Sequence, residues 1–191
     1  MNGDAVGTFE VTSGKIVISD PCYEREIIAA ELPAKNGKWE AETYFNSDDR
    51  VSHLIVHHEN YPINNEHEGD VAPFDVGVDS GQAGVFDSDF YRNDEAVAHL
   101  TDEDRHYKED KIREDEPWYS WCCDRTLGAD CAGIVPHGAV SSSGYGDGCY
   151  ECRLVKDTYT PDYPVVGVII EFISEEDHEY ELDLTYSTDM L

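Results

Sequence analysis

Residues 6–19 read VGTFEVTSGKIVIS, and this stretch decides the fold class. Its residues alternate in polarity and are rich in β-branched side chains, a pattern typical of strands. We therefore expect two short strands, one on each side of Gly14. Asp20-Pro21-Cys22-Tyr23 should follow as a turn, because proline fixes its own backbone and aspartate readily bonds the amides after it.

Similar strand patterns recur along the chain. Asn36-Gly37 is the strongest short hairpin signal and is predicted to join a preceding strand to a strand over residues 38–45. Asp48-Asp49 should then turn the chain into the next strand. Further strands are expected over residues 51–58, 74–78, 149–155 and 165–173, with an edge strand over 179–186.

Residues 93–116 have a different pattern. Asn93 or Thr101 could cap a helix, and acidic residues 102–104 would lie in its first turn, where the helix dipole favours them. The charges that follow alternate without a wide apolar stripe, so we expect a solvated helix that ends at Pro117.

These elements predict a mainly β fold. We expect one domain, residues 1–191, built as an antiparallel β-sandwich of about ten strands with one or two helices inserted at about 93–117. The order of strand, aspartate turn, glycine hairpin and strand in residues 14–58 returns in residues 74–173, which suggests an internal duplication.

The charge of the chain is extreme. Its 191 residues include 42 Asp and Glu against 13 Lys and Arg, a formal net charge of -29. Self-repulsion among so many carboxylates opposes a compact state in dilute salt, whereas at molar salt the Debye length falls to about 3 Å and screens it. We interpret the chain as adapted to high salt. The alternatives are a DNA mimic, which would concentrate its carboxylates on one face, and an ordinary acidic protein.

The same composition argues against several partners and locations. No basic stripe is present to bind nucleic-acid phosphates or an anionic membrane surface. No apolar run approaches the ~18 residues of a transmembrane span, and the first residues lack the features of a signal peptide. We expect a cytoplasmic protein, or a virion protein if a virus encodes it.

Three segments carry a resemblance to a known family. They are Asp20-Pro21-Cys22, the segment VDSGQAGVFD (residues 78–87) and the segment SSGYGDG (142–148) followed by Tyr150. Their order, over roughly residues 14–173, resembles a mainly bacterial family catalogued as a domain of unknown function. The resemblance implies a fold but no activity, substrate or catalytic residue. Cys149, Cys152 and the acidity depart from the family pattern and indicate traits of habitat or lineage.

The glycine loop at residues 143–148 has two interpretations. Its glycines permit positive backbone dihedrals, and it lacks the lysine of a phosphate-binding loop. In the first interpretation it is a structural turn in which Asp147 bonds its own amides. In the second, Asp79, Asp87 and Asp147 converge near Ser80 and Ser143 in an oxygen-rich pocket suited to Ca²⁺ or Mg²⁺.

Either interpretation places the glycine loop beside the Asp79-Ser80-Gly81 turn, with Tyr145 and Tyr150 packed over or beside it. The candidate metal ligands are Asp79, Asp87 and Asp147. The candidate ligand-binding residues are Asp79, Ser80, Asp87, Ser143, Tyr145 and Asp147.

Six cysteines raise the question of zinc. Cys149 and Cys152 form a CxxC, and Cys122, Cys123 and Cys131 lie upstream, so four thiolates could hold a tetrahedral ion. Strand periodicity, however, sends positions 149 and 152 to opposite faces, which favours buried free thiols over zinc. No helix follows to activate a redox CxxC.

The sequence also offers two nucleophilic pairs. Cys22 could pair with His57-His58, and Ser143 could pair with His137 and an aspartate, but neither has the context of a nucleophile elbow.

The function that we expect is non-enzymatic: a binding or structural component of a high-salt setting, including a virion or mobile element. Its partner would be another protein or a second copy of the chain. The alternative is a hydrolase or divalent-metal-binding domain that uses the Asp79, Ser80, Ser143 and Asp147 cluster. A single cleft with a raised carboxylate pKa would favour the enzyme.

Overall fold

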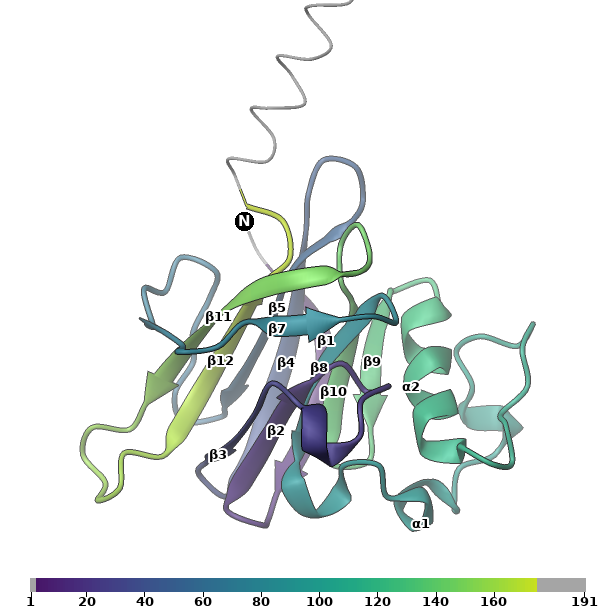
Figure 1. Ribbon diagram of the computed structural model, residues 1–191, viewed down its shortest axis with the longest axis horizontal. Coiled ribbons are helices and arrows are strands. Elements are labelled where there is room, and N and C mark those ends of the chain that lie inside the picture. The colour runs from purple at the N-terminus through teal and green to yellow at the C-terminus, as the bar shows by residue number, and fades with distance from the viewer. Residues whose placement is uncertain (1–2, 175–191) are drawn as a thin grey trace, which may run out of the picture.

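The computed structural model describes residues 3–174, which form two antiparallel sheets packed face to face (Figure 1). The first sheet contains β1 (Asp4–Val11), β4 (Gly37–Phe45), β5 (Val51–His58), β12 (Val165–Glu171), β11 (Gly148–Lys156) and β6 (Asp70–Val71) in that spatial order, with β7 (Val76–Val78) also paired to β11. The second has the order β3 (Ala30–Pro33), β2 (Lys15–Ser19), β8 (Gln82–Asp87), β10 (Gly138–Ser142) and β9 (Ala132–Val135). The predicted β-sandwich with inserted helices is confirmed.

The main core lies between the sheets. Ile16 and Ile18 of β2 face Trp39 of β4 and the apolar side chains of β5 and β12 across it. Successive strand residues point to opposite faces, so Val17, between the two isoleucines, belongs to a second cluster on the outer face of the five-stranded sheet.

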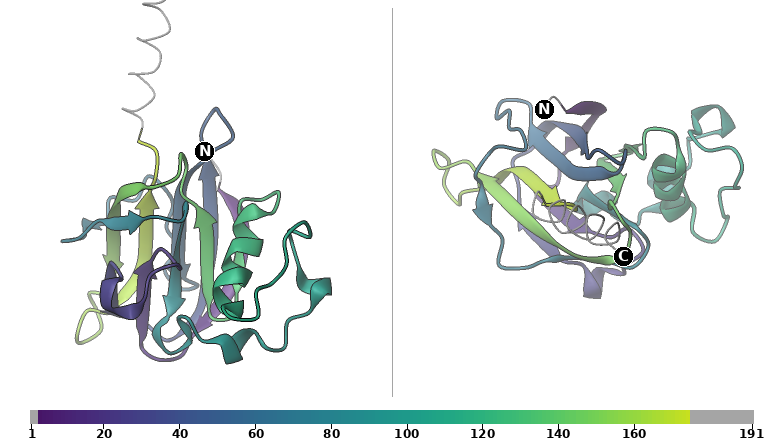
Figure 2. Two further views of the ribbon diagram at one scale, coloured as in Figure 1. Left: turned by 45° about the vertical axis from the view of Figure 1, so that its right-hand side comes forward. Right: turned by 90° about the horizontal axis from the view of Figure 1, so that it is seen from above.

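That outer face is covered by the helix α2 (Pro117–Leu127), as Figure 2 shows. Trp118 and Trp121 of α2 are buried against Val17, Phe86 and Val140. The ring centroids of Phe86 and Trp118 lie 5.1 Å apart in an edge-to-face contact. Both faces of the central strand β8 are therefore covered, and all six of its residues are buried.

The helical insertion differs from the prediction. Asn93 caps α1 (Asp94–Val97) and Thr101 caps the 3-10 helix η3 (Asp102–Asp104), so both predicted caps are confirmed. Neither helix continues to residue 116, and Pro117 begins α2 instead of ending a helix. Proline suits a first helical position because the amide that it lacks would have no partner there. Two further 3-10 helices are η1 (Arg25–Ile27) and η2 (Ser88–Phe90).

Residues 105–113, which we call the strap, have no regular structure but are fixed at both ends. The buried carboxylate of Asp124 accepts hydrogen bonds from Arg105 Nε (3.1 Å) and from the backbone amide of His106 (2.8 Å). At the other end, the amide of Arg113 donates to Ser120 Oγ (3.1 Å). Side chains of α2 thus supply the partners that a continuous helix would have given these backbone groups.

The predicted hairpin at Asn36-Gly37 is wrong. The strand β3 before it pairs with β2 in one sheet, whereas β4 after it pairs with β1 and β5 in the other. Asn36 Oδ1 accepts from the amide of Gly14 at 2.6 Å, and Trp39 Nε1 donates to the carbonyl oxygen of Lys35 at 2.9 Å. These contacts carry the chain across the sandwich, which the local turn signal could not reveal.

Two other expectations are not tested by the structure. The predicted strand at 179–186 lies outside the described residues, and the internal duplication remains a prediction. Within residues 3–174, no helix has the length and apolar character needed to cross a membrane.

Candidate functional site

Two turns meet at one end of the sandwich and form what we call the glycine-loop corner, residues 79–81 and 143–147. Gly148 in β11 pairs with Val78 in β7, and Ser142 in β10 pairs with Gln82 in β8, so both turns leave the sheets side by side. The amide of Ser143 donates to the carbonyl oxygen of Gly81 at 3.0 Å. The predicted closeness of the two segments is confirmed, and it brings together Asp79, Ser80, Ser143, Tyr145 and Asp147.

Asp20 organises the first turn, a role that the sequence analysis missed. Its buried carboxylate accepts from the amides of Asp79 (2.9 Å) and Ser80 (2.7 Å) and from Ser80 Oγ (2.6 Å). It also accepts from the amide of Cys22 at 2.8 Å. The signal that could have revealed it is an aspartate before proline at a strand end, which readily bonds nearby amides. Asp20 therefore joins the turn after β2 to the turn before β8.

The groups around this carboxylate are held neutral. Burial and the neighbouring Asp20 carboxylate raise the pKa of the Cys22 thiol to about 12. Burial and the nearby Cys123 raise the pKa of Tyr119, in α2, to about 12. A thiol with so high a pKa is a poor nucleophile at neutral pH, because the reactive form is the thiolate. The pairing of Cys22 with His57-His58 gains no support from this environment.

The second turn is locked by its own hydrogen bonds. Ser143 is buried, and its Oγ donates to the carbonyl oxygen of Gly146 at 2.8 Å. The hydroxyl of Tyr150 donates to the same carbonyl oxygen at 2.6 Å. Gly144 and Gly146 have φ values of +63° and +114°, which confirms the predicted positive dihedrals. The side chain of Ser143 thus joins the start of the loop to Gly146.

Tyr145 points outward from the corner and is 55% exposed. Its hydroxyl donates to Asp48 Oδ2 at 3.1 Å and accepts from Asn46 Nδ2 at 3.3 Å. The guanidinium of Arg50 lies over its ring, 5.8 Å from the centroid. Beside this ring is a hollow of about 320 Å³ lined by Asp49, Arg50, Val51, Gly81, Cys131, Ser142, Gly144, Tyr145 and Gly146.

Asp87 does not belong to the corner, so its predicted convergence with Asp79 and Asp147 is wrong. It lies at the opposite end of β8, where its carboxylate accepts from the amides of Thr12 (2.5 Å), Ser13 (3.1 Å) and Asp89 (3.0 Å). Burial alone would raise the pKa of Asp87, but these donors outweigh it and hold the pKa below its usual value. Its role is to join the β1–β2 turn to η2.

The predicted metal sites are not formed among residues 3–174, where no three His, Cys, Asp or Glu side chains gather as metal ligands. Without Asp87, the proposed Ca²⁺ or Mg²⁺ site has only Asp79 and Asp147, both exposed. Cys149 is exposed while Cys152 is buried in the core, so the two thiols of the CxxC point to opposite faces, as expected. All six cysteines are free thiols.

The histidines of the two candidate nucleophilic pairs make other contacts. His137 precedes β10 and Ser143 follows it, so the two lie at opposite ends of that strand. The ring of His137 stacks on Phe90. His57 and His58 lie at the end of β5, and both are buried. His58 packs edge-on against Trp39 and Tyr61.

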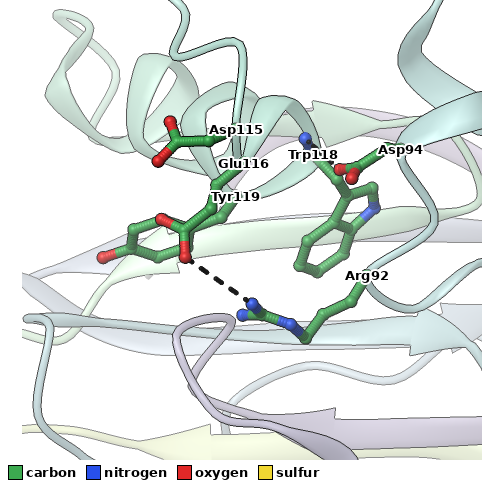
Figure 3. Close-up of a pocket in the computed structure, with 6 residues that line it drawn as sticks. All are labelled: Arg92, Asp94, Asp115, Glu116, Trp118 and Tyr119. Carbon is green, nitrogen blue, oxygen red and sulfur yellow. Dashed lines mark hydrogen bonds and ion pairs between the residues drawn. The ribbon is translucent and has the colours of Figure 1, made fainter.

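A small charged hollow lies beside Arg92 at the start of α2 and is shown in Figure 3. Arg92 reaches from below α2 toward Glu116, 4.0 Å away, and donates to the carbonyl oxygens of Pro21 (3.0 Å) and Cys22 (3.2 Å). The hollow measures about 60 Å³, room for water but not for an organic ligand. Arg92 is thus a structural link between the turn after β2 and the start of α2.

Comparisons of the chain with protein-family models, with curated proteins and with solved structures found no match. The resemblance to a bacterial family of unknown function therefore remains a prediction, and the site is interpreted from its own geometry.

Proposed function

We propose that this protein is a non-enzymatic binding module that works in concentrated salt and binds its partner through the hollow of the glycine-loop corner. The observation that carries the proposal is that different side chains of the corner face inward and outward. Asp20 and Ser143 face inward and hold the two turns, whereas Tyr145 and Arg50 face outward and border the hollow.

The inward groups are poorly suited to hydrolysis. Ser80 Oγ donates to Asp20, and such a pair could in principle activate a serine. Asp20 also accepts from three backbone amides, however, so its oxygens are already occupied in holding the two turns together. Ser143 is buried with its hydroxyl on a backbone carbonyl. These contacts favour binding over the hydrolase alternative.

The outward groups suit an aromatic side chain of a protein partner. A tyrosine ring with a guanidinium over one face offers stacking and cation–π contacts, and tyrosine and arginine are enriched at interface hot spots. In molar salt, charges separated by more than about 3 Å are screened, so ring contacts should carry more of the affinity than ion pairs. The net charge of -29 supports the high-salt setting, in the cytoplasm or in a virion.

The proposal is tested with N-acetyltyrosinamide as the probe in 2 M KCl, followed by amide chemical shifts of ¹⁵N-labelled protein. We expect saturable shifts at Gly81, Tyr145 and Gly146, and weaker shifts with N-acetylalaninamide. The Tyr145→Ala variant should lose them, while Tyr159→Ala, which removes a 94% exposed tyrosine at the other end of β11, should keep them. Shifts that are equal for both probes, or that survive in Tyr145→Ala, would overturn the proposal.

A further inference from the structure

The hairpin turn between β11 and β12, residues 157–164, presents two tyrosines to solvent, and we call it the tyrosine turn. Tyr159 is 94% exposed and Tyr163 is 61% exposed, the first being the most exposed large apolar side chain among residues 3–174. The two rings lie in the same turn of a chain with 42 carboxylates, and exposed apolar surface surrounded by polar residues is typical of interaction sites.

The tyrosine turn is held in one shape. Asp157 is buried, and its carboxylate accepts from the hydroxyls of Thr160 and Tyr61, from the ammonium of Lys35 and from the amide of Tyr159. Asp162 and Tyr163 both have positive φ, +71° and +45°. Consecutive positive φ values in residues other than glycine are unfavourable and are typical of functional loops. The projection is therefore preorganised.

A second unexplained feature is a hollow between the strap and α2. It measures about 340 Å³, and its apolar walls include Ile112 of the strap and Leu127 of α2, which is 50% exposed. Arg105, Lys111 and Arg113 line it as well, together with Asp110 and Asp124. Arg105 is paired with Asp124, and Arg113 with Asp115 and Glu116, so Lys111 is the one of these three cations that forms no ion pair with a described residue. A volume above about 300 Å³ is typical of sites that enclose a group as large as an aromatic ring.

The tyrosine turn and the strap lie at opposite ends of the molecule. In Figure 1, drawn with the longest axis horizontal, the β11–β12 turn is at the far left and the strap at the far right. The view from above in Figure 2 shows the same separation. The turn of one chain cannot reach the hollow of that chain, but it can reach the hollow of another.

We propose that Tyr159 of one copy inserts into the strap hollow of a second copy, so that chains associate head to tail. A tyrosine ring fits the volume and the apolar walls, and Asp162 in the same turn complements the exposed Lys111 beside the hollow. Burial of a ring persists in molar salt, whereas repulsion between two chains of charge -29 is screened there. The occupant that the surface selects is therefore a second copy of this chain.

This contact has a definite consequence for assembly. Because the two surfaces differ, each added copy leaves one turn and one hollow free, and the contact grows into a filament or closes into a ring. A contact built on one inserted loop buries little area and should be weak, with a Kd on the order of 0.1–1 mM. The inference does not use the glycine-loop corner, so it stands or falls independently of the proposed function.

The test is a mixing experiment in 2 M KCl, with mass measured by sedimentation over a range of protein concentrations. Tyr159→Ser removes the turn contact but leaves the hollow, and Leu127→Asp blocks the hollow but leaves the turn. The unaltered chain should exceed twice its 21.5 kDa mass at high concentration, and each variant alone should remain at 21.5 kDa. An equimolar mixture of the two variants should form dimers and nothing larger.

The controls are matched substitutions at exposed positions elsewhere. Val71→Ser and Ile27→Asp, at residues 65% and 62% exposed, should assemble like the unaltered chain. Folding of each variant is checked by its amide spectrum. The unaltered chain gives a second readout that needs no variant, because amide shifts that change with concentration should map to residues 105–113 and 157–164.

Three results would overturn the proposal. The unaltered chain could remain at 21.5 kDa up to 1 mM, a single variant could assemble alone, or the mixture could stay monomeric although both variants are folded. A small molecule as the natural occupant of the hollow would give the first of these results.

Discussion

Gly144 and Gly146 adopt positive φ in the same loop but have different surroundings. A Cβ on Gly144 would lie 2.9 Å from Ile173 Cγ1 and 3.1 Å from the carbonyl oxygen of Val51, whereas one on Gly146 would meet nothing within 4 Å. Gly146→Ala should therefore lower the free energy of unfolding by about 1 kcal/mol through backbone strain alone. Gly144→Ala should lower it further, because the contact with Val51 involves backbone. Urea unfolding in 2 M KCl measures both, and equal losses would contradict this account of the loop.

Asp20 provides the second test at the residue scale. Asp20→Asn keeps the size of the side chain but removes the charge that accepts from three amides and a hydroxyl. We expect a loss of about 2 kcal/mol in the free energy of unfolding, in the range for hydrogen bonds to a charged group. Asp79→Asn is the matched control, since Asp79 is exposed, and it should change little. Similar losses in the two variants would remove Asp20 from its organising role.

The sequence predicted which segments form the corner but not which side chains hold its turns in place. The glycine spacing was sufficient to place residues 143–148 beside the Asp79 turn, because tight turns at strand ends have a recognisable composition. Asp87 was assigned to the corner although four residues of an extended strand lie between it and Gln82. Asp20 was recognised only as a turn residue, because its partners lie about 60 positions away and no local pattern announces them.

Among the elements, the tyrosine turn makes a prediction about pH. Hydrogen bonds from the hydroxyls of Thr160 and Tyr61 and from Lys35 hold the pKa of Asp157 well below its usual range. A lowered pKa in the folded state stabilises the fold above the ordinary aspartate pKa of about 3.9, and that stability is lost as the pH falls toward the folded value.

We therefore expect the difference in stability between the unaltered chain and Asp157→Asn to be constant above about pH 5 and to shrink below pH 4. Urea unfolding of both proteins from pH 3 to pH 7 in 2 M KCl measures this difference. Taking the difference cancels the stability that protonation of other carboxylates adds or removes. A difference in stability that grows on acidification would contradict the role of the Asp157 carboxylate in holding the tyrosine turn.

The elements also show where sequence reasoning succeeds. The strands over 15–19, 51–58 and 165–171 and the caps at Asn93 and Thr101 follow from local periodicity and capping chemistry. The predictions made from Pro117 and from Asn36-Gly37 were wrong because each signal is compatible with two structures. Proline both ends and begins helices, and Asn-Gly turns the chain whether the next strand joins the same sheet or the other. Tertiary contacts, such as Trp39 with the carbonyl oxygen of Lys35, decided the outcome.

For the molecule as a whole, the proposed high-salt setting follows from an apolar core combined with a strongly acidic chain. The apolar side chains fill the space between the sheets and under α2, while 42 carboxylates are distributed over a chain with 13 cationic side chains. Folding brings the carboxylates closer together than in the extended chain, so their repulsion opposes the folded state. Salt shortens the Debye length from about 10 Å at 0.1 M to about 3 Å at 1 M, which removes most of that repulsion.

The most direct measurement is the melting temperature in 0.1 M and 2 M KCl at pH 7, followed by circular dichroism. We predict a rise of at least about 10 °C, which for a chain of this size corresponds to roughly 3 kcal/mol or more. Sucrose at matched osmolality should give a much smaller rise, and the effect of KCl should shrink near pH 4.2, the isoelectric point. Equal melting temperatures at the two salt concentrations, or an equal rise in sucrose, would contradict the claim that this protein is built for concentrated salt.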